Sequence, residues 1–430
     1  MHYLDDCFVI EKSPPLKGMV SLQGSNKSVL SLMVSLLLTD GVSTLHNVPF
    51  TQDVTDMARV LESLGAKVTF YTRLHKLVID TSYIFMSDVA PEMVQKLRES
   101  LFVMGPLLRR TGAARFILSD GGVTQAQFIA KHGDALRSFG VTIDSSHDCI
   151  KIKTDASLRA CKVVLDVPCP YVTSTVLMAA SGIGEGTTLL INASLDPEVT
   201  DLIALLCSMG AVITVHPPAT ISIRGKNELC PVDYTLIVDR TEAGLLLLAA
   251  AASGGEITIP EARVDHLAVL LEKLEEMGHA ISYGEQQKGV NLQATSSPQT
   301  VSCFSGIYPC FPQELQASMM VVQCLVEGAS SLYEQQKFSS LGLVSELRKM
   351  GACIDVYYDR ACIQGVDRLY GADVIAHDAQ SASALVIAGL LAEGTTVLVG
   401  ARHWKRAYEN TERTLKMLGG SIKEVCSYEL

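Results

Sequence analysis

A short phrase built on a glycine recurs six times along this chain of 430 residues. In each copy the glycine follows a helical apolar stretch and opens an apolar strand, and successive copies lie 75, 70, 68, 73 and 68 residues apart. Glycine suits a helix C-terminus because it adopts the left-handed conformation without a Cβ clash. The six copies are Leu64-Gly65-Ala66, Phe139-Gly140-Val141, Met209-Gly210-Ala211, Met277-Gly278-His279, Met350-Gly351-Ala352 and Leu418-Gly419-Gly420. The chain is therefore expected to repeat one structural unit six times.

A second set of glycines keeps the same period, again after a helical run and before a strand. β-Branched residues, which favour strands, follow these marks, as in Glu185-Gly186-Thr187-Thr188. The second set consists of Gly41, Gly112, Gly186, Gly255, Gly328 and Gly394. Each unit of about 70 residues is thus predicted to run strand, helix, strand, helix, strands.

The six units are expected to form two domains of three units each. The period is too long for a common helical solenoid, and the terminal units have no distinct capping composition, so a closed arrangement is favoured. About 210 residues per group of three is near the upper range of one core. The marks split three and three only if the N-terminal strand joins the second group. The predicted domains are therefore residues 23–238, and residues 1–22 plus 239–430.

The charge, hydropathy and cysteine content of the chain argue against several classes of binding partner. The net charge is −11 with no basic run, which argues against nucleic acid. The apolar run Leu245 to Ala252 is too short to span a bilayer, and the N-terminus lacks a signal-peptide pattern, so a cytoplasmic protein without a membrane partner is expected. The 12 cysteines are scattered without a CxxC pair, which predicts buried free thiols and no zinc site.

One glycine turn in the first unit has the composition of an anion site. Gly24-Ser25-Asn26-Lys27-Ser28 precedes a helical apolar run, Val29 to Leu38. Backbone N–H groups and the helix dipole at such a helix N-terminus attract anions. A plain helix cap explains the same motif, and the motif alone leaves both interpretations open.

Several longer strings, in their order and spacing, resemble the enolpyruvyl transferases. Within that family the resemblance is to the UDP-N-acetylglucosamine branch of peptidoglycan synthesis, and it covers nearly the whole chain. The strings are Gly24 to Leu38, Leu64-Gly65-Ala66-Lys67-Val68, Leu97 to Leu108, Val238 to Gly244, Phe311-Pro312-Gln313-Glu314-Leu315-Gln316 and Lys405-Arg406-Ala407-Tyr408-Glu409.

The resemblance implies an α/β fold: a two-domain inside-out α/β barrel built from six βαβαββ repeats, with helices inside and sheets outside. It implies transfer of the enolpyruvyl group of phosphoenolpyruvate to a hydroxyl of UDP-N-acetylglucosamine, with release of phosphate. Phosphoenolpyruvate and a nucleotide sugar, or another phosphorylated acceptor, are then the partners. Neither a metal nor an organic cofactor is required by this reaction, and protein partners are not indicated.

The resemblance also assigns roles to individual residues. It implies catalytic roles for Lys27, for Glu314 as the base and for Asp120 as one candidate for the proton donor. Cationic side chains would act as phosphate or carboxylate clamps. The implied substrate-binding residues are Asn26, Arg98, Lys337, Gln380 and Arg406.

The chain departs from the family pattern at several places. Lys337 and Gln380 stand where the family has arginines, so one charge is kept and one is lost. Asn26 and Lys27 stand in exchanged order, and Glu314 replaces an aspartate. The loop expected to be mobile, Ser119 to Phe128, contains neither the cysteine nor the arginine of the family. The segment Val167 to Thr173 has two prolines and a tyrosine where the family has Ser-Val-Gly. Three readings follow: the family's own reaction, the same transfer to another acceptor, or an inactive homologue that binds an anion or a protein.

Overall fold

The chain folds into two compact units. The computed structural model describes residues 7–117, 123–146, 149–154, 157–334 and 340–425. One unit, here called the contiguous unit, is Gly24–Ile237, and the other, the composite unit, combines Met1–Gln23 with Val238–Leu430. The chain thus passes between units after residue 23 and again after residue 237.

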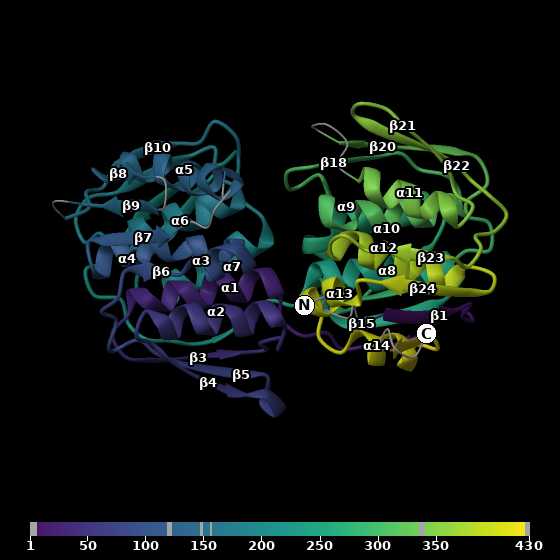
Figure 1. Ribbon diagram of the computed structural model, residues 1–430, viewed down its shortest axis with the longest axis horizontal. Helices are drawn as coiled ribbons and strands as arrows, with labels where there is room; N and C mark the ends of the chain where they lie inside the picture. The colour runs from purple at the N-terminus through teal and green to yellow at the C-terminus, as the bar shows by residue number, and fades with distance from the viewer. Residues whose placement is uncertain (1–6, 118–122, 147–148, 155–156, 335–339, 426–430) are drawn as a thin grey trace. The chain divides into compact units, whose positions relative to one another are not determined.

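Three four-stranded sheets form the outside of the contiguous unit (Figure 1). In each, the first two strands are parallel and the other neighbours antiparallel. In spatial order the sheets are β14 (Asp233–Thr235), β3 (Val42–His46), β5 (Lys76–Asp80) and β4 (Lys67–Tyr71); β6 (Asp88–Val89), β7 (Ala113–Ile117), β9 (Cys149–Lys153) and β8 (Thr142–Ser145); and β10 (Lys162–Val164), β11 (Thr188–Ile191), β13 (Thr220–Arg224) and β12 (Val212–His216).

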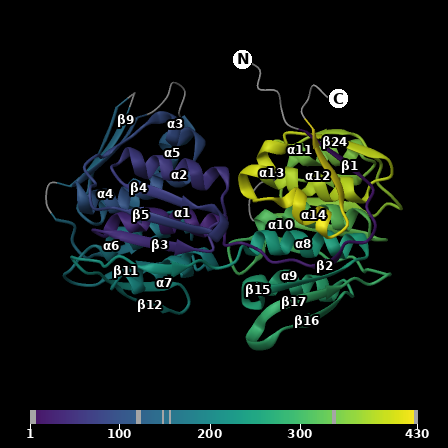
Figure 2. The same ribbon diagram turned by 90° about the horizontal axis from the view of Figure 1, so that it is seen from below.

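The composite unit is built in the same way. Figure 2 shows its sheet of β15, β16 and β17 with β2 beside it. The sheets, in spatial order, are β16 (Ala280–Tyr283), β17 (Lys288–Gln293), β15 (Glu256–Arg263) and β2 (Lys17–Met19); β19 (Phe311–Pro312), β18 (Cys303–Gly306), β20 (Ala329–Glu334), β22 (Arg360–Gln364) and β21 (Cys353–Val356); and β23 (Asp373–Ile375), β24 (Thr395–Val399), β1 (Cys7–Glu11) and β25 (Ser421–Val425).

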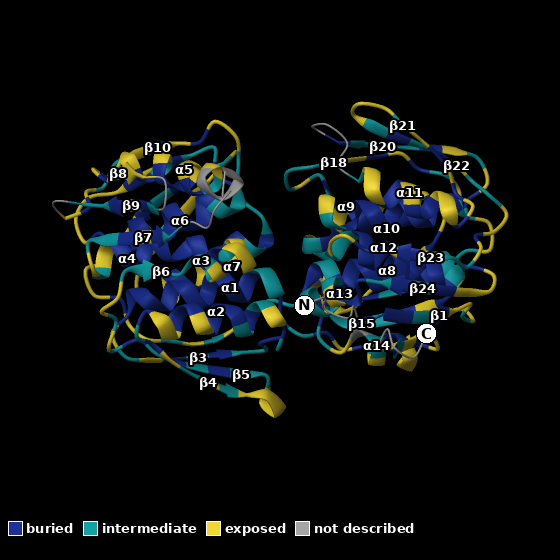
Figure 3. Ribbon diagram, in the orientation of Figure 1, coloured by how far each residue is buried: buried dark blue, intermediate teal, exposed yellow. Residues whose placement is uncertain are grey.

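One set of helices lies inside each unit and is buried nearly all round, as the dark blue ribbons of Figure 3 show. A helix that is apolar on every side belongs in the middle of a core. The inner helices are α1 (Asn26–Ser35), α4 (Met104–Arg110) and α6 (Pro170–Ser181) in the contiguous unit, and α8 (Arg240–Ser253), α10 (Gln313–Cys324) and α12 (Ala379–Leu391) in the composite unit. The predicted inside-out α/β class is confirmed for each unit.

The remaining helices are shorter or bury one face only. They are α2 (Gln52–Ser63), α3 (Pro91–Lys96), α5 (Val123–Arg137), α7 (Pro197–Ser208), α9 (Val264–Glu276), α11 (Leu341–Lys349), α13 (Ala401–Ala407) and α14 (Thr411–Met417), with 3₁₀ turns η1 (Leu36–Leu38), η2 (Thr72–Leu74), η3 (Arg98–Val103) and η4 (Glu285–Gln287). Among the described residues no helix is both long and apolar enough to cross a membrane.

Three strands complete sheets whose other strands are distant in sequence. β1 lies between β24 and β25 and pairs antiparallel with both, so Cys7 is opposite Val399 and Val425. β2 pairs parallel with β15, and β14 pairs parallel with β3. Cys7–Glu11 and Lys17–Met19 are therefore part of the sheets of the composite unit.

The glycine marks have the conformation expected of them, with one correction. Eleven of the twelve marked glycines have positive φ angles, from 75° at Gly112 to 139° at Gly41. The exception is Gly255, because Gly254 holds the left-handed position, φ 72°, that ends α8. A Cβ at Gly255 would lie 2.0 Å from the Leu16 carbonyl oxygen, so this glycine is required by close packing instead.

Two other expectations need correction. The cysteines in the described part of the chain form no disulfide bond, but only Cys7, Cys303 and Cys324 of them are buried. In the segment expected to be a mobile loop, residues 123–128 begin helix α5, while residues 119–122 lie outside the described part.

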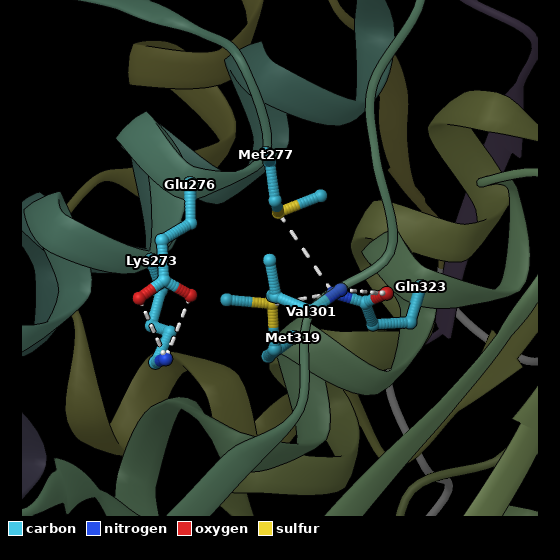
Figure 4. Close-up of polar contacts among 6 residues, drawn as sticks. All are labelled: Lys273, Glu276, Met277, Val301, Met319 and Gln323. Carbon is cyan, nitrogen blue, oxygen red and sulfur yellow. Dashed lines mark hydrogen bonds and ion pairs between the residues drawn. The ribbon is translucent and has the colours of Figure 1, made fainter.

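The amide of Gln323 in α10 is fully buried in the core of the composite unit (Figure 4). Its Nε2 donates to the sulfur atoms of Met277 and Met319 at 3.8 and 3.6 Å, and its Oε1 accepts from Val301 N at 3.5 Å. A buried amide needs such partners to offset its desolvation. These contacts fasten the segment before β18 to the inner helix.

Candidate functional site

The predicted anion turn of the contiguous unit is a capped helix start. Ser25 has extended backbone angles, and its side chain accepts from Ser28 N at 3.3 Å, which satisfies one donor of α1. Asn26 connects α1 to the start of α2: its Oδ1 accepts from Thr51 Oγ1 at 2.6 Å, and its Nδ2 donates to Asp53 at 3.3 Å. Asn26 therefore fixes the position of the neighbouring Lys27.

The opposite side of this helix start is held by a carboxylate that sequence reasoning missed. Asp201 of α7 accepts a hydrogen bond from Ser28 Oγ, and it also accepts from the Tyr234 hydroxyl at 2.6 Å. Burial raises the pKa of Asp201, while these hydrogen bonds act in the opposite direction. The first turn of α1 is thus fixed by α2 on one side and by α7 and β14 on the other.

Lys27 and Arg98 lie on two elements, α1 and η3, that pack against each other. Arg98 begins η3, and its guanidinium carbon lies 4.1 Å from the ring centroid of Phe128 in α5, a cation–π contact. Lys27 is half-buried and acts electrostatically on Glu99, the residue after Arg98. In the contiguous unit Lys27 therefore acts on the Glu99 carboxyl, while Arg98 contacts Phe128.

In the composite unit, carboxyl groups gather near the start of α8. Asp239 caps this helix and accepts from the backbone N–H groups of Thr241 and Glu242 at 2.8 and 3.0 Å. Arg240 lies with its guanidinium carbon 5.7 Å from the ring centroid of Tyr308. The pKa of Glu242 is raised to about 8, mainly by burial and also by the negative charges of Asp239 and Glu409.

The predicted site residues of the composite unit lie in the first or the last turn of a helix. Glu314 is in the first turn of α10, Gln380 in the first turn of α12, and Arg406 in the last turn of α13. Asp378 makes a capping box with Ser381 at the start of α12, so the backbone that carries Gln380 is fixed.

Tyr408 is affected by the charge of Glu314 and by those of the carboxyl groups at α8. Burial raises the pKa of the Tyr408 hydroxyl, and the charges of Asp239, Glu242 and Glu314 act in the same direction. Its ring packs edge-on against Trp404, with centroids 5.3 Å apart. The carboxyl groups of this unit therefore share one electrostatic environment.

The predicted site residues divide between the two units. The contiguous unit carries Asn26, Lys27 and Arg98, and the composite unit carries Glu314, Gln380 and Arg406. Asp120 and Lys337 lie outside the described residues. Within the described ranges, no group of three or more His, Cys, Asp or Glu side chains has the arrangement of a metal site.

Sequence reasoning missed the partners of the predicted residues. Glu99 stands next to Arg98 in the sequence, and this adjacency is the only sequence signal that points to Glu99. The approach of Tyr171 to Glu99, across 72 positions, has no local signal. The pKa of Glu242 likewise depends on Glu409, which lies far along the chain.

Comparison with known proteins places the chain in a family. The family model described as EPSP synthase (3-phosphoshikimate 1-carboxyvinyltransferase) matches residues 10–415. The chain belongs to the EPSP synthase family. This is a family of carboxyvinyl, or enolpyruvyl, transferases, so the predicted family and enzyme class are confirmed.

Relatives of known name extend over the full length. One is UDP-N-acetylglucosamine 1-carboxyvinyltransferase 2 of Caldanaerobacter subterraneus, 36% identical, with 97% of this chain and 99% of the relative covered. Another is UDP-N-acetylglucosamine 1-carboxyvinyltransferase of Geobacter metallireducens, 34% identical, with 98% and 99% covered.

Solved structures share the fold. The enolpyruvyl transferase NikO from Streptomyces tendae superposes with a TM-score of 0.87 at 22% identity, and the coverage is 98% of this chain and 99% of NikO. EPSP synthase from Acinetobacter baumannii gives a TM-score of 0.78 at 15% identity, with 98% and 100% covered. At these identities the likeness concerns the fold alone.

Proposed function

We propose that this protein transfers the enolpyruvyl group of phosphoenolpyruvate to a hydroxyl of UDP-N-acetylglucosamine and releases phosphate, a step of peptidoglycan precursor synthesis. The observation that carries the proposal is the full-length similarity, at 34–36% identity, to the two relatives of that name. A cytoplasmic location agrees with the proposed substrates.

The role proposed for each residue in this reaction follows from the charge or the hydrogen-bonding group of its side chain. Lys27 and Arg98 of the contiguous unit, with Lys337 and Arg406 of the composite unit, supply positive charge for the phosphate and carboxylate of phosphoenolpyruvate. Asn26 and Gln380 offer neutral donors to the substrates. Glu314 accepts the proton of the acceptor hydroxyl as its oxygen attacks.

The reaction is an addition followed by an elimination. In the addition, the acceptor oxygen bonds to C2 of phosphoenolpyruvate, and the methylene carbon gains a proton from Asp120 or another acid. In the elimination, the same carbon loses a proton and the C2–O bond to phosphate breaks. One phosphate is released for each enolpyruvyl group transferred, and no redox step is involved.

One observation favours a second acceptor. Pro170 is the first residue of α6 and has no N–H to donate, and the Tyr171 ring beside it stacks on Phe102. This helix start therefore offers a phosphate group fewer hydrogen-bond donors than the Ser-Val-Gly segment of the family would. The same transfer to a different phosphorylated acceptor is therefore the alternative.

The decisive experiment is phosphate release from phosphoenolpyruvate with separate acceptors. UDP-N-acetylglucosamine, a nucleoside monophosphate and shikimate 3-phosphate are offered in turn, and products are identified by mass. Release with UDP-N-acetylglucosamine supports the proposal, and release only with another acceptor supports the alternative. If no acceptor supports release, the protein is a binding homologue and the proposed reaction is wrong.

A further inference from the structure

Glu99 is held in a defined position by aromatic and hydroxyl contacts. The hydroxyl of Tyr171 in α6 donates to Glu99 Oε1 at 3.3 Å. The Tyr171 ring stacks on the buried Phe102, with centroids 5.8 Å apart and planes inclined by 24°. Because both ends of Tyr171 are engaged, its hydroxyl is directed at the Glu99 carboxyl.

The surroundings of Glu99 favour a proton on its carboxyl group. Desolvation is the main cause that raises the pKa of Glu99, and the negative charge of Asp53 adds to it. The positive charge of Lys27 and the hydrogen bond from Tyr171 lower the pKa. Lys27 comes from α1, Asp53 from α2 and Tyr171 from α6, and η3 packs against all three helices. Arg98, next in the chain, is directed at Phe128.

We propose that Glu99 is the acid that protonates the methylene carbon of phosphoenolpyruvate, with Tyr171 as the residue that positions its carboxyl group. The inference rests on the proposed function, because it places phosphoenolpyruvate against Lys27 and Arg98. It identifies the proton donor that the reaction needs as Glu99 of η3.

The proposed steps balance. In the addition, the O–H bond of the Glu99 carboxyl breaks and a C–H bond forms at the methylene carbon. The acceptor oxygen bonds to C2 at the same time, and its proton passes to Glu314. In the elimination, the Glu99 carboxylate takes a proton back from the methyl carbon as the C2–O bond to phosphate breaks. The leaving phosphate takes the proton held by Glu314, which returns Glu314 to its ionised form. Glu99 therefore ends each cycle protonated.

Binding of an anion strengthens this arrangement. An anion beside Lys27 partly neutralises the positive charge that stabilises the ionised form of Glu99, and it adds a like charge of its own. Proton occupancy at Glu99 should therefore rise when phosphoenolpyruvate binds. Binding is then coupled to uptake of a proton, which is measurable without turnover.

The first test uses full-length protein and Glu99→Gln. Gln keeps an acceptor for Tyr171 but has no proton to give, so turnover should fall by at least about 100-fold, the usual contribution of a positioned acid. Deuterium from D₂O should enter the methylene group more slowly by the same factor, while binding of phosphoenolpyruvate persists. Glu99→Asp should restore part of the rate. Glu92→Gln, at an exposed position of the preceding helix, is the matched control.

Tyr171→Phe gives a readout that a merely structural role would not change. Loss of the hydroxyl removes a hydrogen bond that lowers the pKa of Glu99, so the limb of the pH–rate profile that reports this acid should move to higher pH. Glu99→Gln turnover within threefold of the wild type overturns the proposal. The proposal is also overturned if Asp120→Asn loses turnover while Glu99→Gln keeps it, because Asp120 would then be the acid.

The second test separates this proposal from the proposed function. Phosphoenolpyruvate is titrated calorimetrically in two buffers of different ionisation enthalpy, and the protons taken up per binding event are compared between wild type and Glu99→Gln. Greater uptake by the wild type supports Glu99 even if no acceptor gives turnover, in which case only the proposed function fails. The titrations are repeated over a series of pH values that extends above the Glu99 pKa, and equal uptake at every pH overturns the inference. An absence of phosphoenolpyruvate binding overturns both.

Discussion

At the scale of the residue, Arg406 carries the clearest test of anion binding in the composite unit. A charge-assisted hydrogen bond to a buried anion contributes roughly 1.5–3 kcal/mol. Arg406→Ala should therefore weaken phosphoenolpyruvate binding by about tenfold or more, as measured by calorimetry. Arg402→Ala, one turn earlier on α13 and exposed, is the control and should bind as the wild type does. Unchanged affinity in Arg406→Ala would place the anion elsewhere.

Glu242 makes a second prediction at this scale, about pH and stability. Its pKa is about 8 in the fold against 4.5 as its ordinary value. Because the folded state holds this proton more tightly, the contribution of Glu242 to stability is fully present below pH 4.5. It is lost as the pH rises through 8, by about 5 kcal/mol at most.

Glu242→Gln should therefore lose less stability than the wild type between pH 5.5 and pH 8.5. Trp404, the one tryptophan of the chain, lies in the composite unit, so its fluorescence during urea unfolding reports this unit. Glu272→Gln, at an exposed position of α9, should follow the wild type. If Glu242→Gln shows the same pH dependence as the wild type, Glu242 is ionised in the fold.

At the scale of the element, two repeats close tightly where the residue after a strand meets the end of an inner helix. Gly365 follows β22, and a Cβ there would lie 1.8 Å from the Val326 carbonyl oxygen. Gly225 follows β13 in the third repeat, where a Cβ would lie 2.4 Å from the Ala180 carbonyl oxygen. The obstacle in both cases is backbone, which cannot move aside as a flexible side chain does.

Gly365→Ala should therefore destabilise the composite unit by roughly 1–3 kcal/mol, the usual cost of overpacking. The measurement is the urea midpoint followed by Trp404 fluorescence. Gly306→Ala is the matched control, because the nearest atoms to its added Cβ lie at 3.4 Å. Equal midpoints for the two variants would contradict the close approach at Gly365.

At the scale of the whole molecule, the sequence predicts the fold class well because the repeat is written in local chemistry. Positive φ angles, strand-forming residues and apolar helices are properties of short segments, and these repeat six times. Contacts between distant segments are not local, so the bond between Tyr171 and Glu99 and the effect of Glu409 on Glu242 were not foreseen. The exchange of Asn26 and Lys27 is visible in the sequence, but the attachment of Asn26 to α2 is visible only in the packed structure.

The composite organisation of the chain gives the last prediction. The core of the contiguous unit draws only on residues 24–237 in the described structure, so a fragment of those residues should fold alone. Residues 238–430 lack β1, which lies between β24 and β25, and β2, which borders β15. A fragment of 238–430 should therefore fail to unfold cooperatively by Trp404 fluorescence, because a central strand is missing.

Joining residues 1–23 after residue 430 through a short linker should restore a cooperative transition. A short linker suffices because Cys7, the first residue of β1, pairs with Val425, the last residue of β25. The same construction with residues 1–23 in scrambled order is the control. A cooperative transition in the unmodified 238–430 fragment, equal in midpoint to the permuted one, would show that the N-terminal strands are dispensable for this unit.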